Sequence, residues 1–242
     1  MNPATMPDKL PRIAPASFNF LRDLEKNNDR DWFTGNKDKY DTARTNVITV
    51  ADALIERLRT HDSIATEDGK KCLYRIYNDT RFHKDKPPYK TWFGGSIGRV
   101  KPALRGGYYF RLKPDASFIA CGFFAPEPAD LKRIRIDIDQ DLNAWRKLLK
   151  AKKLSDTFGD ILGDGVKTAP KGYAQDHPGI DLLRMKQFLF RRALTNKEVL
   201  AQDLVERMDE IYRAIRPFFD HMSEVLTTDV NGVSLLRSPR KR

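Results

Sequence analysis

Apolar residues recur with a helical period at both ends of the chain and with a shorter period in between. Phe18, Leu21 and Leu24 share one helical face, and Ser17 stands where a side chain caps the first turn. Apolar and aromatic positions continue at helical spacing, which predicts a second, longer helix from about Asp31 to Thr60. The N-terminal quarter of the chain is therefore predicted to be helical.

From Leu73 the pattern changes to short runs rich in aromatic and β-branched residues, with glycines and prolines between them. Such runs are typical of strands, and we expect three or four antiparallel strands here. Pro114-Asp115 separates the last two runs with turn-forming residues, which predicts a hairpin. The runs are LYRIYND, TWFGGSIGRV, GGYYFRLK and ASFIACGFF.

Helical spacing returns after Pro126 and predicts a helix to about Lys150, followed by a shorter one. KQFLFRRAL is compatible with one more strand. Thr195 and Glu198 have the spacing of a capping box at the start of a final helix, in which Pro217 should cause a kink. The order of these elements predicts an α+β fold, with an antiparallel sheet of about four to six strands in the middle of the chain, covered by N- and C-terminal helices.

The composition favours one domain in a cytoplasmic protein. We expect a flexible proline-rich arm at 1–16, a single α+β domain at 17–225 and a basic disordered tail at 226–242. No apolar run approaches the ~18 residues of a membrane span, and no secretory signal is evident. Cys72 and Cys121 lie in apolar runs, are typical of buried cysteines, and lack the neighbours of a zinc site.

Positive charge is concentrated in one segment of the chain. The net charge is +11. From Lys70 to Lys113 the sequence holds twelve basic residues and two acidic ones, a balance of +10 that leaves +1 for the rest. This distribution is typical of a surface that binds anions. The alternative is that half of these side chains point to unrelated solvent-exposed faces, because a strand alternates its faces.

Within that segment the alternation at 75–81 predicts a charged face. On a regular strand Arg75, Tyr77, Asp79 and Arg81 point the same way. Asp79 could orient one guanidinium and leave the other for a phosphate or carboxylate. Equally, the three charges could be a structural clamp that pins the sheet to a helix.

Aromatic residues interleave with these cations, a combination that suits base stacking in single-stranded nucleic acid, although half of the rings must be core. They are Tyr74, Tyr77, Tyr89, Trp92, Tyr108 and Tyr109. No phosphate-loop, dinucleotide or hydrolase signature is present. Gly94-Gly95 is more typical of a bulge or tight bend than of a phosphate loop. We predict no cofactor, and no metal site, because Asp79 and Asp85 stand among many cations.

Asp79 and His177 are the candidate catalytic residues, and neither indicates a reaction. His177 lies in a loop with Lys171 and Tyr173, beside Asp176. An enzyme acting on a small anionic substrate would need a pocket between this loop, at 170–178, and the motif at 75–89. The alternative is that His177 anchors its own loop.

The chain resembles the bacterial family of conserved hypothetical proteins that carry the domain of unknown function 2461. The resemblance rests on a pattern of Arg75, Asp79, Arg81, Phe82, Asp85, Lys86 and Tyr89, on NNDRDWF at 27–33, and on PKGY at 170–173. It covers roughly residues 17–225 and implies no known activity, substrate or cofactor. Asn78 departs from the pattern, which has an arginine there, and this departure removes one cation.

The function favoured by the sequence is a binding module for a phosphate-bearing or otherwise anionic ligand, either a nucleotide or single-stranded nucleic acid. The alternatives are the enzyme described above and a salt-bridged structural motif whose function lies in protein contacts. The sequence does not indicate an oligomeric state. The candidate ligand-binding residues are Arg75, Asp79, Arg81, Asp85, Lys86, Tyr89, Lys90, Lys171, Tyr173 and His177.

Overall fold

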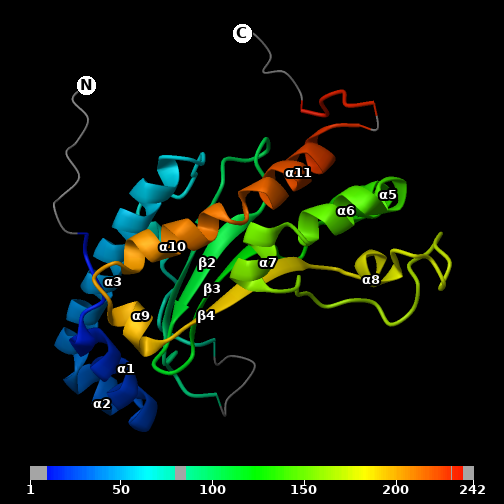
Figure 1. Ribbon diagram of the computed structural model, residues 1–242. Helices are drawn as coiled ribbons and strands as arrows, with labels where there is room; N and C mark the ends of the chain where they lie inside the picture. The colour runs from blue at the N-terminus through cyan, green and yellow to red at the C-terminus, as the bar shows by residue number, and fades with distance from the viewer. Residues whose placement is uncertain (1–9, 80–85, 230, 237–242) are drawn as a thin grey trace, which may run out of the picture. The chain divides into compact units, whose positions relative to one another are not determined.

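The fold is α+β, as predicted, with a four-stranded antiparallel sheet in the middle of the chain and helices on either side of it in sequence (Figure 1). The computed structural model describes residues 10–79, 86–229 and 231–236. The strand order is β1-β2-β3-β4. The strands are β1 (Phe93–Gly98), β2 (Gly107–Leu112), β3 (Ser117–Phe123) and β4 (Phe188–Leu194).

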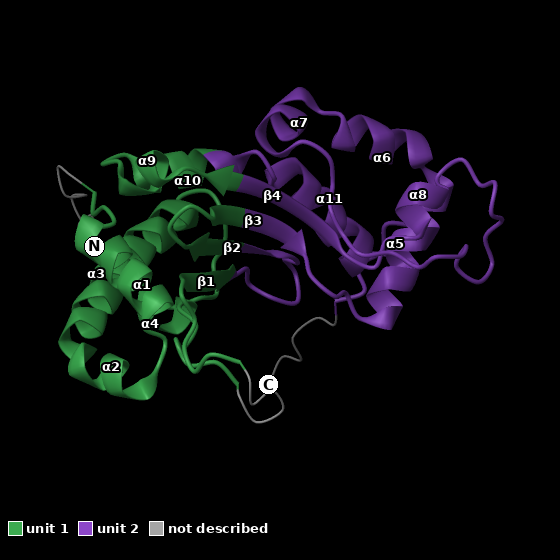
Figure 2. Cartoon of the chain, turned by 90° about the horizontal axis from the view of Figure 1, so that it is seen from below, with its two compact units in different colours: residues 1–97, 109–119, 193–210 green, residues 98–108, 120–192, 211–242 purple. Residues whose placement is uncertain are grey.

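The chain divides into two compact units (Figure 2). Unit 1 consists of residues 1–97, 109–119 and 193–210, and unit 2 of residues 98–108, 120–192 and 211–242. Segments distant in sequence therefore build each unit. The two units are described separately below.

The helices at the start of unit 1 differ from the prediction at two places. The first helix begins at Pro15 rather than after Ser17, since proline suits the first turn of a helix. Ser17 is inside that helix and donates a hydrogen bond to Asn46 Oδ1 at 2.9 Å. The long second helix is interrupted at Asn36, which has a non-helical backbone. The helices are α1 (Pro15–Lys26), α2 (Arg30–Gly35), α3 (Lys37–Arg59) and α4 (Gly69–Cys72).

Aromatic rings form the core that joins these helices to β1. Phe20 of α1 lies 6.4 Å from Phe93 of β1, centroid to centroid, and Tyr40 of α3 lies 6.3 Å from the same ring. Phe33 of α2 packs edge-on against Phe20 at 6.5 Å. All four residues are buried. The helical period seen in the sequence therefore marks the faces that meet the sheet.

The predicted strand at 73–79 is replaced by two isolated bridges, of Leu73 with Gly95 and of Tyr77 with Tyr89. Ile76 is buried and its two neighbours are exposed, so the expected alternation of faces is present. The pairing does not extend along 86–88 because Pro87 and Pro88 have no backbone N–H to donate.

The predicted hairpin between β2 and β3 is confirmed. Asp115 adopts a left-handed φ of 63° in the turn, a conformation that aspartate tolerates better than most residues. Its N–H donates to Asn196 Oδ1 at 2.9 Å. Asn196 opens α9 (Asn196–Leu200), which has the predicted capping box between Thr195 and Glu198.

In the C-terminal half, two helices predicted as continuous are divided: the one expected to end near Lys150 forms two helices, and the final one forms three. The helix expected to reach Lys150 breaks at Asp141, whose side chain accepts from Ala144 N at 2.9 Å and caps the next helix. The final helix breaks twice, the second time just before Pro217, which sits in the first turn of the last helix. The remaining helices are α5 (Pro128–Gln140), α6 (Leu142–Leu149), α7 (Lys152–Phe158), α8 (Ile180–Leu183), α10 (Leu204–Arg213) and α11 (Arg216–Thr227).

Unit 2 has an aromatic core of its own. Phe219 of α11 packs edge-on against Tyr108 at 5.2 Å and Phe123 at 5.7 Å. Trp145 of α6 packs edge-on against Phe218 at 6.0 Å. Within the described residues no helix combines the length and the apolar character needed to cross a bilayer.

Candidate functional site

Three cations of unit 1, Arg75, Lys86 and Lys90, have no acidic partner among the described residues. Arg75 and Lys86 are exposed and Lys90 is half-buried. Burial, together with the positive charges of Lys86 and Arg75, lowers the pKa of Lys90. Within the described ranges no carboxylate forms an ion pair with any of these three side chains. We call Arg75, Lys86 and Lys90 the cationic cluster. Like charges that repel one another and lack counter-charges attract an anion.

The cationic cluster is held in place by hydrogen bonds between backbone segments. The Lys90 N–H donates to the Ile76 carbonyl at 2.7 Å, and the Asn78 N–H donates to the Pro88 carbonyl at 2.8 Å. Lys90 Nζ donates to the carbonyl oxygens of Arg75, at 2.8 Å, and Tyr77. An ammonium has three protons, so Lys90 keeps one donor for a further partner.

Asn28, two residues before α2, holds the backbone at Tyr89, next to Lys90. Its Nδ2 donates to the Tyr89 carbonyl at 2.9 Å, and the Tyr89 N–H donates to its Oδ1 at 3.1 Å. The side chain of Asn28 thus imitates a neighbouring strand. Asn28 belongs to the stretch at 27–33 that carries the family resemblance, but this role cannot be predicted from the sequence because Asn28 and Tyr89 are 61 positions apart.

Asn78, the departure from the family pattern, has a structural role. Its Nδ2 donates to the Pro87 carbonyl at 2.8 Å, while its backbone N–H bonds to Pro88. The amide and the backbone of Asn78 therefore both bond to the Pro87-Pro88 segment. An arginine could also donate to a carbonyl oxygen, so the replacement of the cation leaves this contact possible.

Other members of the predicted site have different surroundings. Tyr89 is 6% exposed and its ring stacks on Phe33 at 4.0 Å, so its ring belongs to the core. Burial raises the pKa of Tyr89. Asp79 is exposed and has interactions of its own. Arg81 and Asp85 lie outside the described residues, so the Arg–Asp–Arg arrangement stays a prediction.

A row of rings lies on the half-exposed face of the strands in unit 1. Tyr74 is 47% exposed and contacts Trp92 at 6.5 Å and Tyr109 at 6.1 Å. Tyr109 in turn contacts Phe118 at 5.7 Å. We call Tyr74, Trp92, Tyr109 and Phe118 the ring row. Of the six rings that interleave with the cations in the sequence, Tyr89 and Tyr108 are buried, fewer than the half that were expected to be core.

Arg111 of β2 lies over the ring row. Its guanidinium is 4.8 Å from the Trp92 ring centre and 5.9 Å from that of Phe118. Its Nε is buried and has no hydrogen-bond partner, and in the described parts of the chain no carboxylate pairs with it. Lys90 Nζ lies 6.0 Å from the centre of the same Trp92 ring, so the ring row adjoins the cationic cluster.

Gly94 and Gly95 serve the packing of this region. A Cβ on Gly94 would lie 2.6 Å from the Trp92 ring, and one on Gly95 would lie 2.5 Å from Cys72 Sγ. Both glycines lie inside β1 and allow close approach of a side chain to the strand. The Cys72 thiol is buried, and burial together with Asp52 and Asp68 raises its pKa to about 12.

The loop at 170–178 belongs to unit 2, whereas the cationic cluster belongs to unit 1. His177 Nε2 lies 2.9 Å from Asp139 Oδ1, and its Nδ1 accepts the Gly179 N–H at 3.0 Å. Nε2 therefore carries the proton, and neither ring nitrogen is available to take one from a substrate. This arrangement supports a loop-anchoring role for His177. Lys171 is exposed, and burial, followed by the charge of Asp139, raises the pKa of Tyr173.

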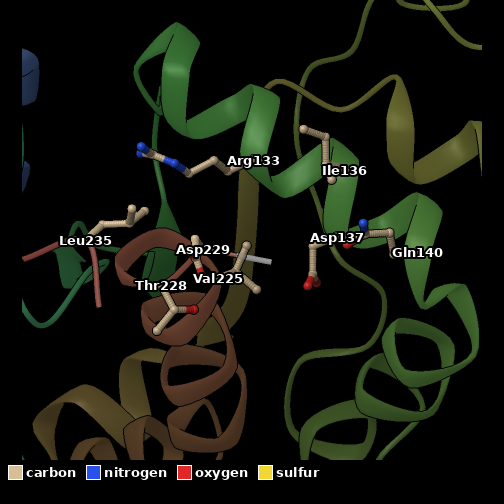
Figure 3. Close-up of a pocket in the computed structure, with 8 residues that line it drawn as sticks. All are labelled: Arg133, Ile136, Asp137, Gln140, Val225, Thr228, Asp229 and Leu235. Carbon is tan, nitrogen blue, oxygen red and sulfur yellow. The ribbon is translucent and has the colours of Figure 1, made fainter. Parts of the chain in front are cut away.

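Unit 2 also has a groove of about 260 Å³ along α5 and the end of α11 (Figure 3). Asp137 on its wall accepts from Trp145 Nε1 at 2.6 Å and lies 3.2 Å from His221 Nε2. Burial opposes ionisation, but His221 and Trp145 outweigh it and lower the pKa of Asp137. The Asp137 carboxylate thus has a structural role, in which it links α5 to Trp145 and His221. The residues of the groove are Arg133, Ile136, Asp137, Gln140, Val225, Thr228, Asp229 and Leu235.

Within the described ranges no three His, Cys, Asp or Glu side chains are grouped as metal ligands would be. No curated protein and no solved structure is significantly similar to the chain. The model of one family, described as "Conserved hypothetical protein (DUF2461)", matches residues 16–221. The match spans all four strands of the sheet and all three stretches that carry the resemblance, so the chain belongs to the conserved hypothetical protein family DUF2461.

Proposed function

We propose that the protein is a binding module for a phosphate-bearing ligand, a nucleotide or single-stranded nucleic acid, and that the cationic cluster receives the phosphate. The observation that carries this proposal is the set of Arg75, Lys86 and Lys90, which pair with no described carboxylate. Lys90 Nζ lies 2.8 Å from the Arg75 carbonyl oxygen, and burial, together with the positive charges of Lys86 and Arg75, lowers its pKa. A phosphate, which carries one negative charge within a strand and up to two at the end of a nucleotide, would relieve that repulsion and accept hydrogen bonds from these side chains.

Charge pairing in the rest of the chain supports this assignment. Basic side chains elsewhere are commonly paired: Lys113 bonds Glu25 at 2.6 Å, and Arg146 makes two bonds to Asp181. A surface that evolved only for solubility would intersperse both signs. The segment around 75–90 instead leaves its described cations available to a ligand.

No specific observation supports either of the two alternatives, the enzyme or the structural clamp. The enzyme hypothesis needs a base. Both nitrogens of His177 are engaged, and Asp79, the other candidate, is exposed and has interactions of its own. The structural-clamp hypothesis needs carboxylates beside the cations, and Arg75 and Lys86 have none in the described part of the chain.

Titration of a fluorescently labelled single-stranded oligonucleotide, followed by anisotropy over a range of salt concentrations, tests the proposal. We expect binding tighter than about 10⁻⁴ M at low salt, weakening steeply as salt rises because counterions are released. Lys86→Gln should reduce the slope of log K against log salt by about 0.7, the value for one phosphate contact on a single strand.

Lys197→Gln is the matched control, since Lys197 is exposed on α9 and the variant has the same net charge. It should leave the slope unchanged. If neither the oligonucleotide nor inorganic pyrophosphate, titrated separately, binds at low salt, the proposal is wrong. Equal slopes for the two variants would remove the cationic cluster from it.

A further inference from the structure

We infer that the ring row stacks unpaired nucleobases, so that the ligand of the cationic cluster is a single-stranded nucleic acid rather than a free nucleotide. This inference rests on the proposed function, because the phosphates of the strand would bind the cationic cluster. It adds a second contact, made by rings and not by charge.

The burial pattern of β2 places the ring row on the side of the strand away from the core. Phe110 and Leu112 are buried, whereas Tyr109 and Arg111, which alternate with them, are half-buried. A half-exposed row of aromatic rings is costly to leave in water, and it is more typical of a binding surface than of a monomer's solvent-exposed face. Tyr74, the outermost ring of the row, is 47% exposed.

The orientation of the rings provides places for bases. Tyr74 meets Trp92 edge-on, at an interplanar angle of 88°, so the contact between these rings does not cover both faces of either ring. The Tyr74 hydroxyl donates to Ser96 Oγ at 3.0 Å, which fixes the orientation of the ring before a ligand arrives. A ring held in place loses little conformational entropy when a base stacks on it.

Arg111 supplies the charge that a base-stacking surface needs beside its rings. Its guanidinium is held against Trp92 and Phe118, and among the described residues it has no acidic partner and its buried Nε has no hydrogen bond. A guanidinium in this position can stack on a base with its plane and bond a phosphate with its edge.

Continuity with the cationic cluster determines the kind of ligand. Lys90 belongs to the cluster and lies 6.0 Å from the Trp92 ring centre, so cations and rings form one surface in unit 1. A mononucleotide has one base and one phosphate group and can occupy only part of it. A duplex hides its bases from the rings. A single strand offers phosphates and stacked bases together.

The test compares an ordinary single-stranded oligonucleotide with an abasic strand of the same length, which has the phosphates without the bases. The ordinary strand should bind about 10-fold more tightly or better, since each base–ring stack contributes strongly to affinity. It should also quench the fluorescence of Trp92, a signal that the Trp92→Phe variant loses. A mononucleotide should bind more weakly than either strand.

The variant pair Tyr74→Leu and Tyr74→Phe separates stacking from other effects of the residue. Tyr74→Leu should weaken binding of the ordinary strand about 10-fold, leave the abasic strand unchanged and leave the salt slope unchanged. Tyr74→Phe keeps the ring and should bind nearly as the unaltered protein does. Circular dichroism of both variants checks that the fold is intact.

The outcomes distinguish the two proposals. If ordinary and abasic strands bind equally, the cationic cluster binds phosphate but the ring row stacks no base, and this inference is wrong while the proposed function stands. If neither strand nor the mononucleotide binds at low salt, the proposed function itself is wrong. A duplex that binds more tightly than the single strand would also overturn the inference.

Discussion

Asn28 is the residue whose replacement most directly tests how the cationic cluster is held. Its amide makes two hydrogen bonds to the backbone of Tyr89, at 2.9 and 3.1 Å, in a partly buried position. Asn28→Ala removes both and leaves the Tyr89 N–H and carbonyl without their partners. Each hydrogen bond contributes about 1 kcal/mol net, and stranded polar groups add to the loss, so we expect about 2–3 kcal/mol of destabilisation.

The free energy of unfolding can be measured by urea denaturation and the midpoint temperature by calorimetry. In a chain of this size, each kcal/mol lost from the free energy of unfolding lowers the midpoint temperature by about 2–4 °C, so we expect the midpoint to fall by roughly 5–10 °C. Lys90 follows Tyr89 directly, so the same variant should also weaken oligonucleotide binding. Asn28→Asp should be no better than alanine, because a carboxylate cannot donate to the Tyr89 carbonyl.

Asn27→Ala is the control for this prediction. Asn27 is exposed and its side chain makes one hydrogen bond, to the Asp23 carbonyl at 2.9 Å. Its loss should cost no more than about 0.5 kcal/mol, as for other surface changes. If Asn28→Ala is equally mild, the paired hydrogen bonds do not hold the segment at 86–90, and the account of how the cationic cluster is positioned is wrong.

Two further predictions concern unit 2. The pKa of Asp137 in the folded chain lies below its ordinary value of 3.8, so the stability that this carboxylate contributes is present above pH 3.8 and is lost as the pH falls through the lower, folded value. The stability of Asp137→Asn, measured by urea unfolding, should therefore depend less on pH below 3.8 than that of the unaltered protein. Asp160→Asn, at an exposed position, is the control and should keep the original pH dependence. His177→Ala breaks the contacts with Asp139 and Gly179, so hydrogen exchange at 170–178 should accelerate while oligonucleotide affinity changes less than about twofold; a tenfold loss of affinity, worth about 1.4 kcal/mol, would instead place this loop in the binding site.

The sequence by itself determined the class of fold and the place of the charge. Helical spacing, the turn at Pro114-Asp115 and the capping box at Thr195 depend on neighbours in sequence, and each of these was confirmed. The concentration of cations between Lys70 and Lys113 is likewise visible without coordinates. The boundaries of helices were less certain, as at Ser17 and Asn36, because contacts with other elements compete with local preference.

The tertiary structure decided which of these residues can act together. Alternation along 73–79 suggested a strand, but whether a strand forms depends on the N–H groups of the opposite segment, and two prolines stand there. Tyr89 and Tyr74 are equally aromatic in the sequence, yet one stacks in the core and the other is half exposed. The pairing of Asn28 with Tyr89 across 61 residues, and the meeting of Lys90 and Arg111 at Trp92, depend on how the chain returns upon itself. Residue types set what each side chain can bind, and only packing brings those side chains to one surface.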